Sequence, residues 1–343
     1  MITLKKIISL SIISLILLSC NKKDDDIVKE NQIYYETNLT LWSVNNSLNS
    51  KMWEQAITIF EKQNRCKITL IKFQNCFSLY DSLKSLEQNS KNRKVDVVTG
   101  LSNQLMVNAQ YDSLFLHHKP INYHKVKNRF KYGLDCYTIP YGYNYLVFFY
   151  NKDNLEYIPK SFGQLQDSFF KGRLLLFNPE STALGNNFII WSFSAFEISG
   201  YRHFWRGIKE NIYSIEKDYK QACSMFKNET VSLMLGYLCN PFIKSKNNYF
   251  CPQEGSFMQI YSAAISRYSE NKQTAELFLE FLLSKEFQSL LTKEKPMYPI
   301  EYKIEQIAKY NKISENDLTK KISKEIINKY TPLWLKNWNR IIK

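Results

Sequence analysis

Residues 38–73 read NLTLWSVNNSLNSKMWEQAITIFEKQNRCKITLIKF, and this stretch changes twice between two kinds of apolar spacing. At both ends apolar and polar residues alternate, which predicts two strands. Between the ends, Trp53 and the apolar residues after it recur every three or four positions, which predicts a helix over 51–63. A second helix is expected over 79–86 and a short apolar strand over 95–98. Strands and helices in this order predict an α/β fold with a parallel sheet.

The same pattern starts again after Tyr150, at the end of a long aromatic strand region over 137–150. Further strands are expected at 173–177, 212–215 and 232–237, with helices over 183–196 and 220–227 and a turn into a helix at 159–165. A second round of β/α elements predicts a second α/β lobe. Near the C-terminus we expect an amphipathic helix over 274–291 and further helices beyond Ile304.

The first twenty residues, MITLKKIISLSIISLILLSC, have the layout of a bacterial export signal. Two lysines precede an apolar run over 7–18, which is shorter than the roughly 20 residues that a membrane-spanning helix needs. The ending Leu-Leu-Ser-Cys resembles the lipobox of bacterial lipoproteins, whose cysteine is acylated, for example with palmitate. We therefore expect a lipoprotein signal peptide at 1–20 with the lipid on Cys20, and a flexible tether at 21–37. Such a protein is exported and anchored to a membrane, on its periplasmic or cell-surface face.

The composition excludes several classes of function. The formal net charge is +14, but the lysines are scattered and no basic stripe is interleaved with aromatic residues, so we expect no nucleic-acid partner. The adjacent His117 and His118 have no acidic or cysteine partner at ligand spacing, so we expect no metal site, and no motif indicates a cofactor. If Cys20 is lipidated, the remaining cysteines permit disulfides without defining a pairing: Cys66, Cys76, Cys136, Cys223, Cys239 and Cys251.

Short motifs lie in order along the rest of the chain. They are DVVTGLSNQL at 96–105, IPYGYNY at 139–145 followed by FYNK at 149–152, PKSF at 159–162, NPEST at 178–182 with Gly185 and Trp191, and EG at 254–255 with MYP at 297–299. In this order and spacing they resemble the motifs of the thiamine-binding periplasmic proteins of ABC importers. The resemblance extends from about Leu39 to Ile300, and on these motifs the chain is identified as a member of that family.

This resemblance implies a type II periplasmic-binding-protein fold, in which two α/β lobes joined by crossing hinge strands close over a small ligand. It implies one lobe made of residues 38–145 and 253–343 and a second lobe made of residues 146–252. It also implies the substrate-binding protein of an ABC importer, which binds thiamine or thiamine phosphates between the lobes and delivers them to the permease and ATPase subunits. The family consists of binding proteins, so we expect no enzymatic activity.

Four candidate ligand residues combine a local pattern with the resemblance. Ser181 and Thr182 lie between a predicted strand and a predicted helix, where they suit a helix cap, and the free N–H groups behind a cap suit an anion. The resemblance implies that this loop contacts the ligand, although an ordinary helix cap has the same sequence. It also implies that Tyr219 and Tyr237 face the ligand, with rings suited to a thiazolium cation and a pyrimidine. A lone tyrosine is more often half-buried packing.

Three positions carry no charge where the family pattern has carboxylates: Asn45, Asn75 and Ser102. Pro296 likewise stands where the family has a tryptophan. A cationic ligand loses electrostatic partners through these changes, and Asp218 is the residue able to compensate. We expect Asp218 and the three substituted positions to contact the ligand. The cleft should therefore favour thiamine phosphates over free thiamine more than the family norm.

Three other functions stay open. Related receptors bind Fe(III) through tyrosinates, and Tyr141, Tyr143 and Tyr145 are available, without a clear histidine or carboxylate partner. Thiaminase I shares the fold and attacks thiamine with a cysteine; Cys76 lies in an expected ligand loop, but no base stands at a recognisable spacing. A surface lipoprotein that only binds a partner is the third alternative, and a closed, ligand-sized cleft would argue against it.

Overall fold

The computed structural model describes residues 37–44, 49–88, 94–103, 111–131, 136–243, 248–300, 313–319 and 321–343. Residues Tyr35–Lys343 form one compact unit. The expected signal peptide, the lipidated Cys20 and the expected ligand residue Asn45 lie outside the described residues. So does the expected tether at 21–37, except for its last residue.

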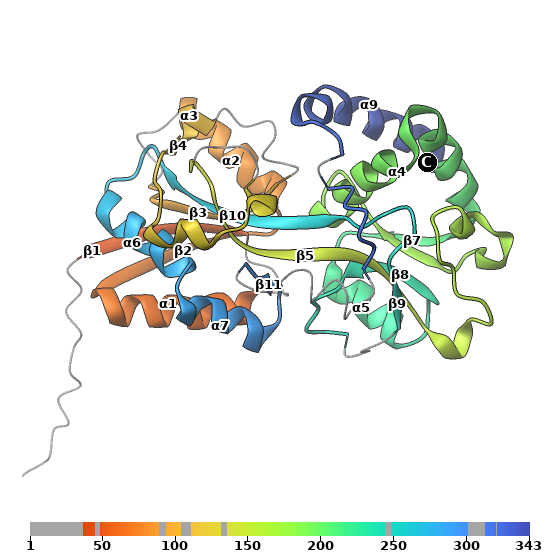
Figure 1. Cartoon of the computed structure of the whole chain (residues 1–343), viewed down its shortest axis with the longest axis horizontal. Coiled ribbons are helices and arrows are strands. Elements are labelled where there is room, and N and C mark those ends of the chain that lie inside the picture. Colours follow the sequence, from red (N-terminus) through yellow and green to blue (C-terminus); the bar gives the residue numbers. More distant parts are fainter. Residues whose placement is uncertain are drawn as a thin grey trace, which may run out of the picture. The chain divides into compact units, whose positions relative to one another are not determined.

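A mixed β-sheet runs through this unit, with β5 and β10 side by side at its centre (Figure 1). The strand order is β2-β1-β3-β10-β5-β8-β6-β7. The strands are β1 Thr37–Val44, β2 Cys66–Phe73, β3 Val97–Ser102, β4 Phe115–Leu116, β5 Ile139–Tyr150, β6 Leu174–Phe177, β7 Ile212–Glu216, β8 Leu233–Tyr237, β9 Tyr249–Phe250, β10 Met258–Ser266 and β11 Tyr298–Pro299. β1 pairs in parallel with β2 and β3, and β6 pairs in parallel with β7 and β8.

The expectation of a parallel sheet is correct for these outer strands and wrong for the centre. β10 runs antiparallel to both β3 and β5, and β5 runs antiparallel to β8. β10 was not predicted from the sequence. It returns to the middle of the sheet from late in the chain, and its buried polar residue Gln259 interrupts the apolar pattern that marks the other strands.

β5 belongs to both halves of the sheet. Its residues from Ile139 to Tyr145 pair with β10, and its residues from Leu146 to Tyr150 pair with β8. We call β2-β1-β3-β10 with the start of β5 the first half, and the end of β5 with β8-β6-β7 the second half. The change of partner falls between Tyr145 and Leu146, and we keep that position as the proposed boundary between the lobes.

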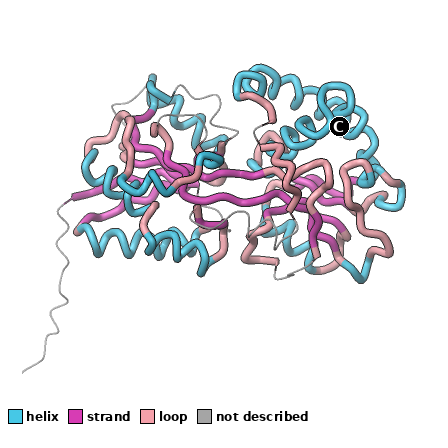
Figure 2. Tube along the Cα trace, in the orientation of Figure 1, coloured by secondary structure: helices cyan, strands magenta, loops and turns pink. Residues whose placement is uncertain are grey.

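Helices flank both halves (Figure 2). Beside the first half lie α1 Ser50–Asn64, α2 Cys76–Gln88, α3 Tyr111–Leu114, α6 Lys272–Leu282 and α7 Lys285–Glu294; beside the second lie α4 Ala183–Ile208, α5 Tyr219–Lys227 and α9 Lys324–Ile342. The apolar spacing of α1 is explained by its neighbours. The Trp53 ring stacks on Phe278 of α6 at a centroid distance of 6.5 Å and contacts Phe287 of α7 at 5.8 Å. One apolar stripe on α1 therefore packs against two helices from the other end of the chain.

Two helical expectations are wrong. The single helix expected over 274–291 is two helices, because Ser284 starts the second one: its hydroxyl accepts a hydrogen bond from the N–H of Phe287 at 3.2 Å. The turn into a helix expected at 159–165 forms only a 3-10 turn at Gln164–Gln166. Both helices bury apolar residues at helical spacing, so the apolar spacing of 274–291 alone does not reveal the break.

The last helix, α9, packs on α4, beside the second half of the sheet (Figure 1). The division into one lobe of residues 38–145 and 253–343 and a second lobe of residues 146–252 stays a proposal. Trp334 stacks on Phe193 at a centroid distance of 4.0 Å, and the Trp334 carbonyl accepts a hydrogen bond from the Tyr201 hydroxyl at 3.3 Å. Burial of this large aromatic surface holds α9 in place.

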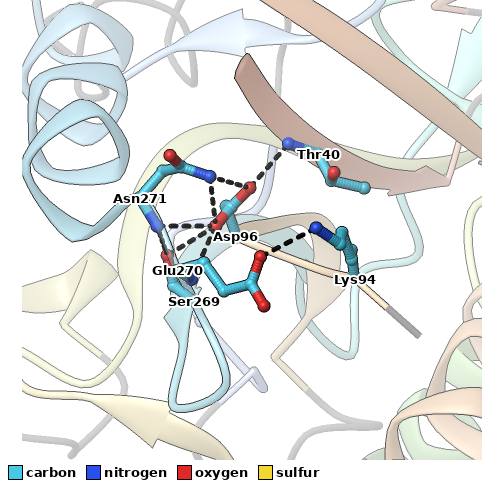
Figure 3. Close-up of polar contacts among 6 residues, drawn as sticks. All are labelled: Thr40, Lys94, Asp96, Ser269, Glu270 and Asn271. Carbon is cyan, nitrogen blue, oxygen red and sulfur yellow. Dashed lines mark hydrogen bonds and ion pairs between the residues drawn. The ribbon is translucent and has the colours of Figure 1, made fainter. Parts of the chain in front are cut away.

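Asp96 opens the first family-like motif, and it holds the first half of the sheet together (Figure 3). Its carboxylate accepts hydrogen bonds from the N–H of Thr40 on β1 and the hydroxyl of Ser269, both at 2.7 Å. It also accepts from the N–H groups of Glu270 and Asn271, both at 3.1 Å. The carboxylate thus ties β1 to the turn between β10 and α6, so the role of Asp96 is structural.

Two absences hold for the described residues. None of the helices there is both long and apolar enough to span a lipid bilayer. Among the described residues no two of the six cysteines form a disulfide with each other.

Candidate ligand-binding site

A cleft of about 490 Å³ opens between the loops of the two halves, a volume suited to a small molecule. The first half contributes Val44, Asn49, Gln74, Asn75, Cys76, Gly100 and Ser102; the second contributes Phe177, Ser181, Thr182, Ala183, Leu184, Lys217, Asp218, Tyr219 and Tyr237; β10 and the segment before β11 add Gln259, Tyr261, Pro296 and Met297. Both halves therefore contribute walls to one site.

The N-terminus of α4 faces this cleft. Thr182 is its N-cap: the hydroxyl accepts a hydrogen bond from the N–H of Gly185 at 3.0 Å and donates to the carbonyl of Asn178 at 2.8 Å. Ala183 and Leu184 follow, and within the described chain their N–H groups make no hydrogen bond. The buried hydroxyl of Ser181 also lacks a partner there. The helix that begins here is regular until Glu197, where a φ of 59° interrupts it, and free N–H groups at its positive end suit an anion.

Two more helices begin at the same cleft. Asn75 caps α2 with its side-chain oxygen, which accepts from the N–H of Ser78 at 2.9 Å. Asp218 caps α5 and accepts from the N–H of Gln221 at 2.7 Å. Lys217 and Asp218 carry the formal charges among the cleft residues described, and both are exposed. Because Lys217 and Asp218 offset each other in formal charge, the three helix N-termini are what make the cleft electropositive.

An aromatic row forms one wall. The Tyr219 ring lies between Phe177, at a centroid distance of 5.3 Å, and Tyr237, at 5.7 Å. The Tyr219 hydroxyl accepts from the N–H of Tyr237 and from the amide of Asn240, both at 3.0 Å. Burial raises the pKa of Tyr219 and Tyr237 well above its ordinary value, so both phenols stay protonated. Contacts with neighbouring residues of the protein therefore already cover much of the surface of the Tyr219 and Tyr237 rings.

The floor of the cleft is polar, and sequence reasoning missed most of it. Gln259 on β10 is 3% exposed, and its side-chain oxygen accepts from the Tyr237 hydroxyl at 2.6 Å and from the amide of Asn187 at 2.7 Å. Ser102 is 1% exposed, and its hydroxyl has no partner among the described residues. The register of β3 and β10 places Ser102 directly opposite Tyr261. No local pattern marks Gln259, because its hydrogen-bond partners lie on α4 and β8, far from it in the chain.

The structure brings the expected ligand residues together, with Asn45 outside the described part. The cleft walls include Asn75, Ser102, Ser181, Thr182, Asp218, Tyr219 and Tyr237. Of the two expected cap residues, Thr182 is the N-cap, whereas the Ser181 hydroxyl caps no N–H group. Asn75 and Asp218 are also helix caps, which the sequence analysis did not predict. That these residues hold a ligand stays a proposal.

A nucleophilic role for Cys76 does not fit the site. Cys76 is 6% exposed, and burial raises the pKa of its thiol to about 12, so the thiol is protonated at neutral pH. Among the described cleft residues there is no histidine, and the Asp218 carboxylate is engaged at the start of α5. Nothing in the described cleft is therefore placed to activate Cys76.

The tyrosines considered for Fe(III) also lie elsewhere. Tyr141, Tyr143 and Tyr145 are at most 3% exposed on β5 and are not part of the cleft walls. Burial raises the pKa of Tyr141 and Tyr143, which disfavours tyrosinate. Within the described residues, no three histidine, cysteine, aspartate or glutamate side chains are grouped so as to hold a metal ion.

Comparison with known proteins shows which family the chain belongs to. The model of the family described as bacterial extracellular solute-binding protein matches residues 92–330. The chain belongs to this family. The thiamine-binding periplasmic protein of Salmonella typhimurium is 26% identical over 289 residues, which cover 82% of this chain and 86% of that protein.

Solved structures agree with this solute-binding protein in fold. A periplasmic thiamin binding protein matches with a TM-score of 0.75 and 23% identity, covering 89% of this chain and 96% of its own. A periplasmic binding protein from Actinobacillus pleuropneumoniae with fructose-6-phosphate bound matches with a TM-score of 0.74 and 17% identity, covering 89% and 99%. The expected type II periplasmic-binding-protein fold is confirmed. The relatives are binding proteins, so this solute-binding protein is a transport component and not an enzyme.

Proposed function

We propose that this solute-binding protein is the lipid-anchored receptor of an ABC importer and that it binds thiamine phosphates in the cleft. The observation that carries the proposal is the meeting of three helix N-termini, those of α2, α4 and α5, at one small electropositive site. An anionic group is the ligand part that such a site favours.

The α4 end is best equipped for the phosphate. The N–H groups of Ala183 and Leu184 and the hydroxyl of Ser181 are free within the described chain, and all three residues line the cleft. Each is a donor, and a phosphate group offers only acceptors once it is ionised. Lys217 adds a positive charge nearby.

The aromatic wall is the proposed place for the rest of the ligand. Tyr219 and Tyr237 line the cleft, and the exposed edge of such a row suits a flat heterocycle or a thiazolium cation. Asp218 stands next to Tyr219 and supplies the one carboxylate of the described cleft. A ligand with a cationic ring and an anionic tail matches both ends.

The relatives support this choice. The related protein of Salmonella typhimurium is named a thiamine-binding periplasmic protein, and one protein of the same fold holds a sugar phosphate. The importer permease and ATPase are the partners that the family implies. Cys20, at the end of the signal-like segment, is the proposed lipid attachment site.

Isothermal titration of the purified protein with thiamine, thiamine monophosphate and fructose 6-phosphate tests the ligand. We expect the monophosphate to bind at least about tenfold more tightly than thiamine, since its anionic group gains charge-assisted hydrogen bonds. Equal or tighter binding of free thiamine would contradict the proposed charge preference. Binding of the sugar phosphate alone would replace the thiamine assignment, and native mass spectrometry of the protein as purified would identify any ligand carried along.

A further inference from the structure

We infer that the Gln259 NH₂ group, with the Ser102 hydroxyl on the same face of the sheet, provides two hydrogen-bond donors on the cleft floor for acceptor atoms of the ligand, and that Gln259 discriminates against a donor. The inference deepens the proposed function, since it assumes only that the ligand occupies this cleft. It adds a specificity-determining residue, Gln259, that neither the family motifs nor the helix ends point to.

The orientation of the Gln259 amide carries the argument. A side-chain amide oxygen accepts two hydrogen bonds, and this one already accepts from Tyr237 and Asn187 at 2.6 and 2.7 Å. The oxygen is saturated inside the protein. What Gln259 has left is its NH₂ group, and Gln259 is part of the cleft wall.

A chain of hydroxyl groups keeps the amide in this orientation. The hydroxyl of Tyr261 is hydrogen-bonded to that of Tyr237, whose own hydroxyl meets the Gln259 oxygen. Burial raises the pKa of both tyrosines, so each keeps its single proton. If Tyr261 donates to Tyr237, then Tyr237 donates to Gln259, and each bond in the chain has one donor and one acceptor.

Ser102 completes the pair. Gln259 and Tyr261 are two residues apart on β10 and therefore point to the same side of the sheet, and Ser102 pairs with Tyr261 in the register. The Ser102 hydroxyl is buried, lines the cleft and has no partner among the described residues. A buried hydroxyl without a partner is unfavourable until something in the cleft bonds to it.

The chemistry of the pair selects the ligand atom. An ester or phosphate oxygen can accept from both groups, and an unprotonated ring nitrogen, which has a single lone pair, accepts from one of them. An N–H group or an ammonium finds at Gln259 only an oxygen that is already used. Asn187, which helps to hold that oxygen, lies on α4, so the floor adjoins the helix end proposed to hold the phosphate.

The serine variants give the first test, with thiamine monophosphate and inorganic phosphate as probes in calorimetry. Ser102→Ala removes a hydroxyl that makes no bond in the described protein, so the melting temperature of the ligand-free protein should stay the same or rise while affinity falls about 3- to 10-fold. Ser214 on β7 is the matched control, because its hydroxyl is also buried without a partner but lies outside the cleft. Ser214→Ala should change neither quantity. Equal affinities for the two variants and the wild type would overturn the role of Ser102.

Gln259→Glu gives the second test. A carboxylate still accepts from Tyr237 and Asn187, but it loses the donor, so affinity at about pH 8 should fall at least about 30-fold. Burial raises the pKa of such a carboxyl group, so at about pH 5.5 its O–H replaces the lost donor. The difference in affinity between the variant and the wild type should then become smaller. A constant difference, or wild-type affinity at pH 8, contradicts the inference. Gln259→Met, which keeps neither the donor nor the acceptor, is the reference for stability. A melting temperature of Gln259→Glu at pH 5.5 as low as that of Gln259→Met also contradicts the inference, because it would mean that the amide NH₂ group, and not the oxygen, faces Tyr237 and Asn187.

The two proposals fail separately. If the wild type binds inorganic phosphate but no thiamine compound, the thiamine assignment is wrong, and the same variants titrated with phosphate still test the donor pair. If thiamine monophosphate binds and neither Ser102→Ala nor Gln259→Glu lowers its affinity, the proposed function stands and the inference about the donor pair is wrong. If the wild type binds neither probe, both are rejected.

Discussion

Asn75→Asp changes the charge of the cleft with little change in shape. Asn75 caps α2 through its side-chain oxygen, and an aspartate oxygen accepts the same hydrogen bond from the N–H of Ser78. The cap is therefore kept and stability should change by less than about 1 kcal/mol. What the substitution adds is one negative charge on the cleft wall, at a position where the family pattern carries a carboxylate.

The size of the effect follows from the size of the cleft. A sphere of about 490 Å³ has a radius of about 5 Å, which is the distance from a wall residue to a charge at the ligand's centre. At that distance two unit charges interact by about 3 kcal/mol at an effective dielectric constant of 20 and by about 0.8 kcal/mol in water. We therefore expect the preference for thiamine monophosphate over thiamine to fall about 4- to 150-fold, with thiamine itself binding more tightly than to the wild type.

Calorimetric titration of both ligands at low and high salt measures this preference. Asn151→Asp is the matched control, because Asn151 also caps a helical turn through its side-chain oxygen but lies outside the cleft. The control should leave the preference unchanged, and added salt should reduce the effect of Asn75→Asp. An unchanged preference in Asn75→Asp, with binding intact, would refute the electrostatic reasoning.

Three further predictions concern the anchor and stability. Asp96→Asn should lower the free energy of unfolding by about 2–3 kcal/mol in urea titrations, because a charged acceptor of several hydrogen bonds is lost; a change below about 0.5 kcal/mol would show that the carboxylate is dispensable. Cys20→Ser should move the protein from the membrane to the soluble fraction, and retention with an uncleaved signal would mean that the segment is misread. The pKa of the Cys76 thiol rises from 9.0 to about 12 on folding. The protein's stability is therefore unaffected by this thiol below about pH 9 and decreases as the pH rises above that value. Cys76→Ser should therefore remove about 1.4 kcal/mol of the stability lost between about pH 8 and pH 10, and parallel pH profiles for the two proteins would contradict this.

Local spacing was enough to predict the elements whose two sides face different surroundings. The helix over 51–63 and the strand over 66–73 form as expected, because alternating or helical burial leaves a trace in the residues themselves. The break at Ser284 and the position of α9 could not be predicted in this way. One depends on a single cap hydrogen bond, and the other on which of two apolar surfaces a C-terminal helix covers.

The same distinction between local pattern and tertiary structure applies to the residues of the candidate site. A local cap pattern singled out Ser181 and Thr182. Asn75 and Asp218 were named only through the resemblance, for the charge that the cleft lacks or keeps. Only the tertiary structure showed that these residues line one cleft and that burial keeps the thiol of Cys76 protonated. It also showed Gln259, whose role depends on bonds to Asn187 and Tyr237, 72 and 22 residues away in the chain. A sequence records which side of an element is buried, whereas hydrogen bonds between distant residues exist only once the strands have paired.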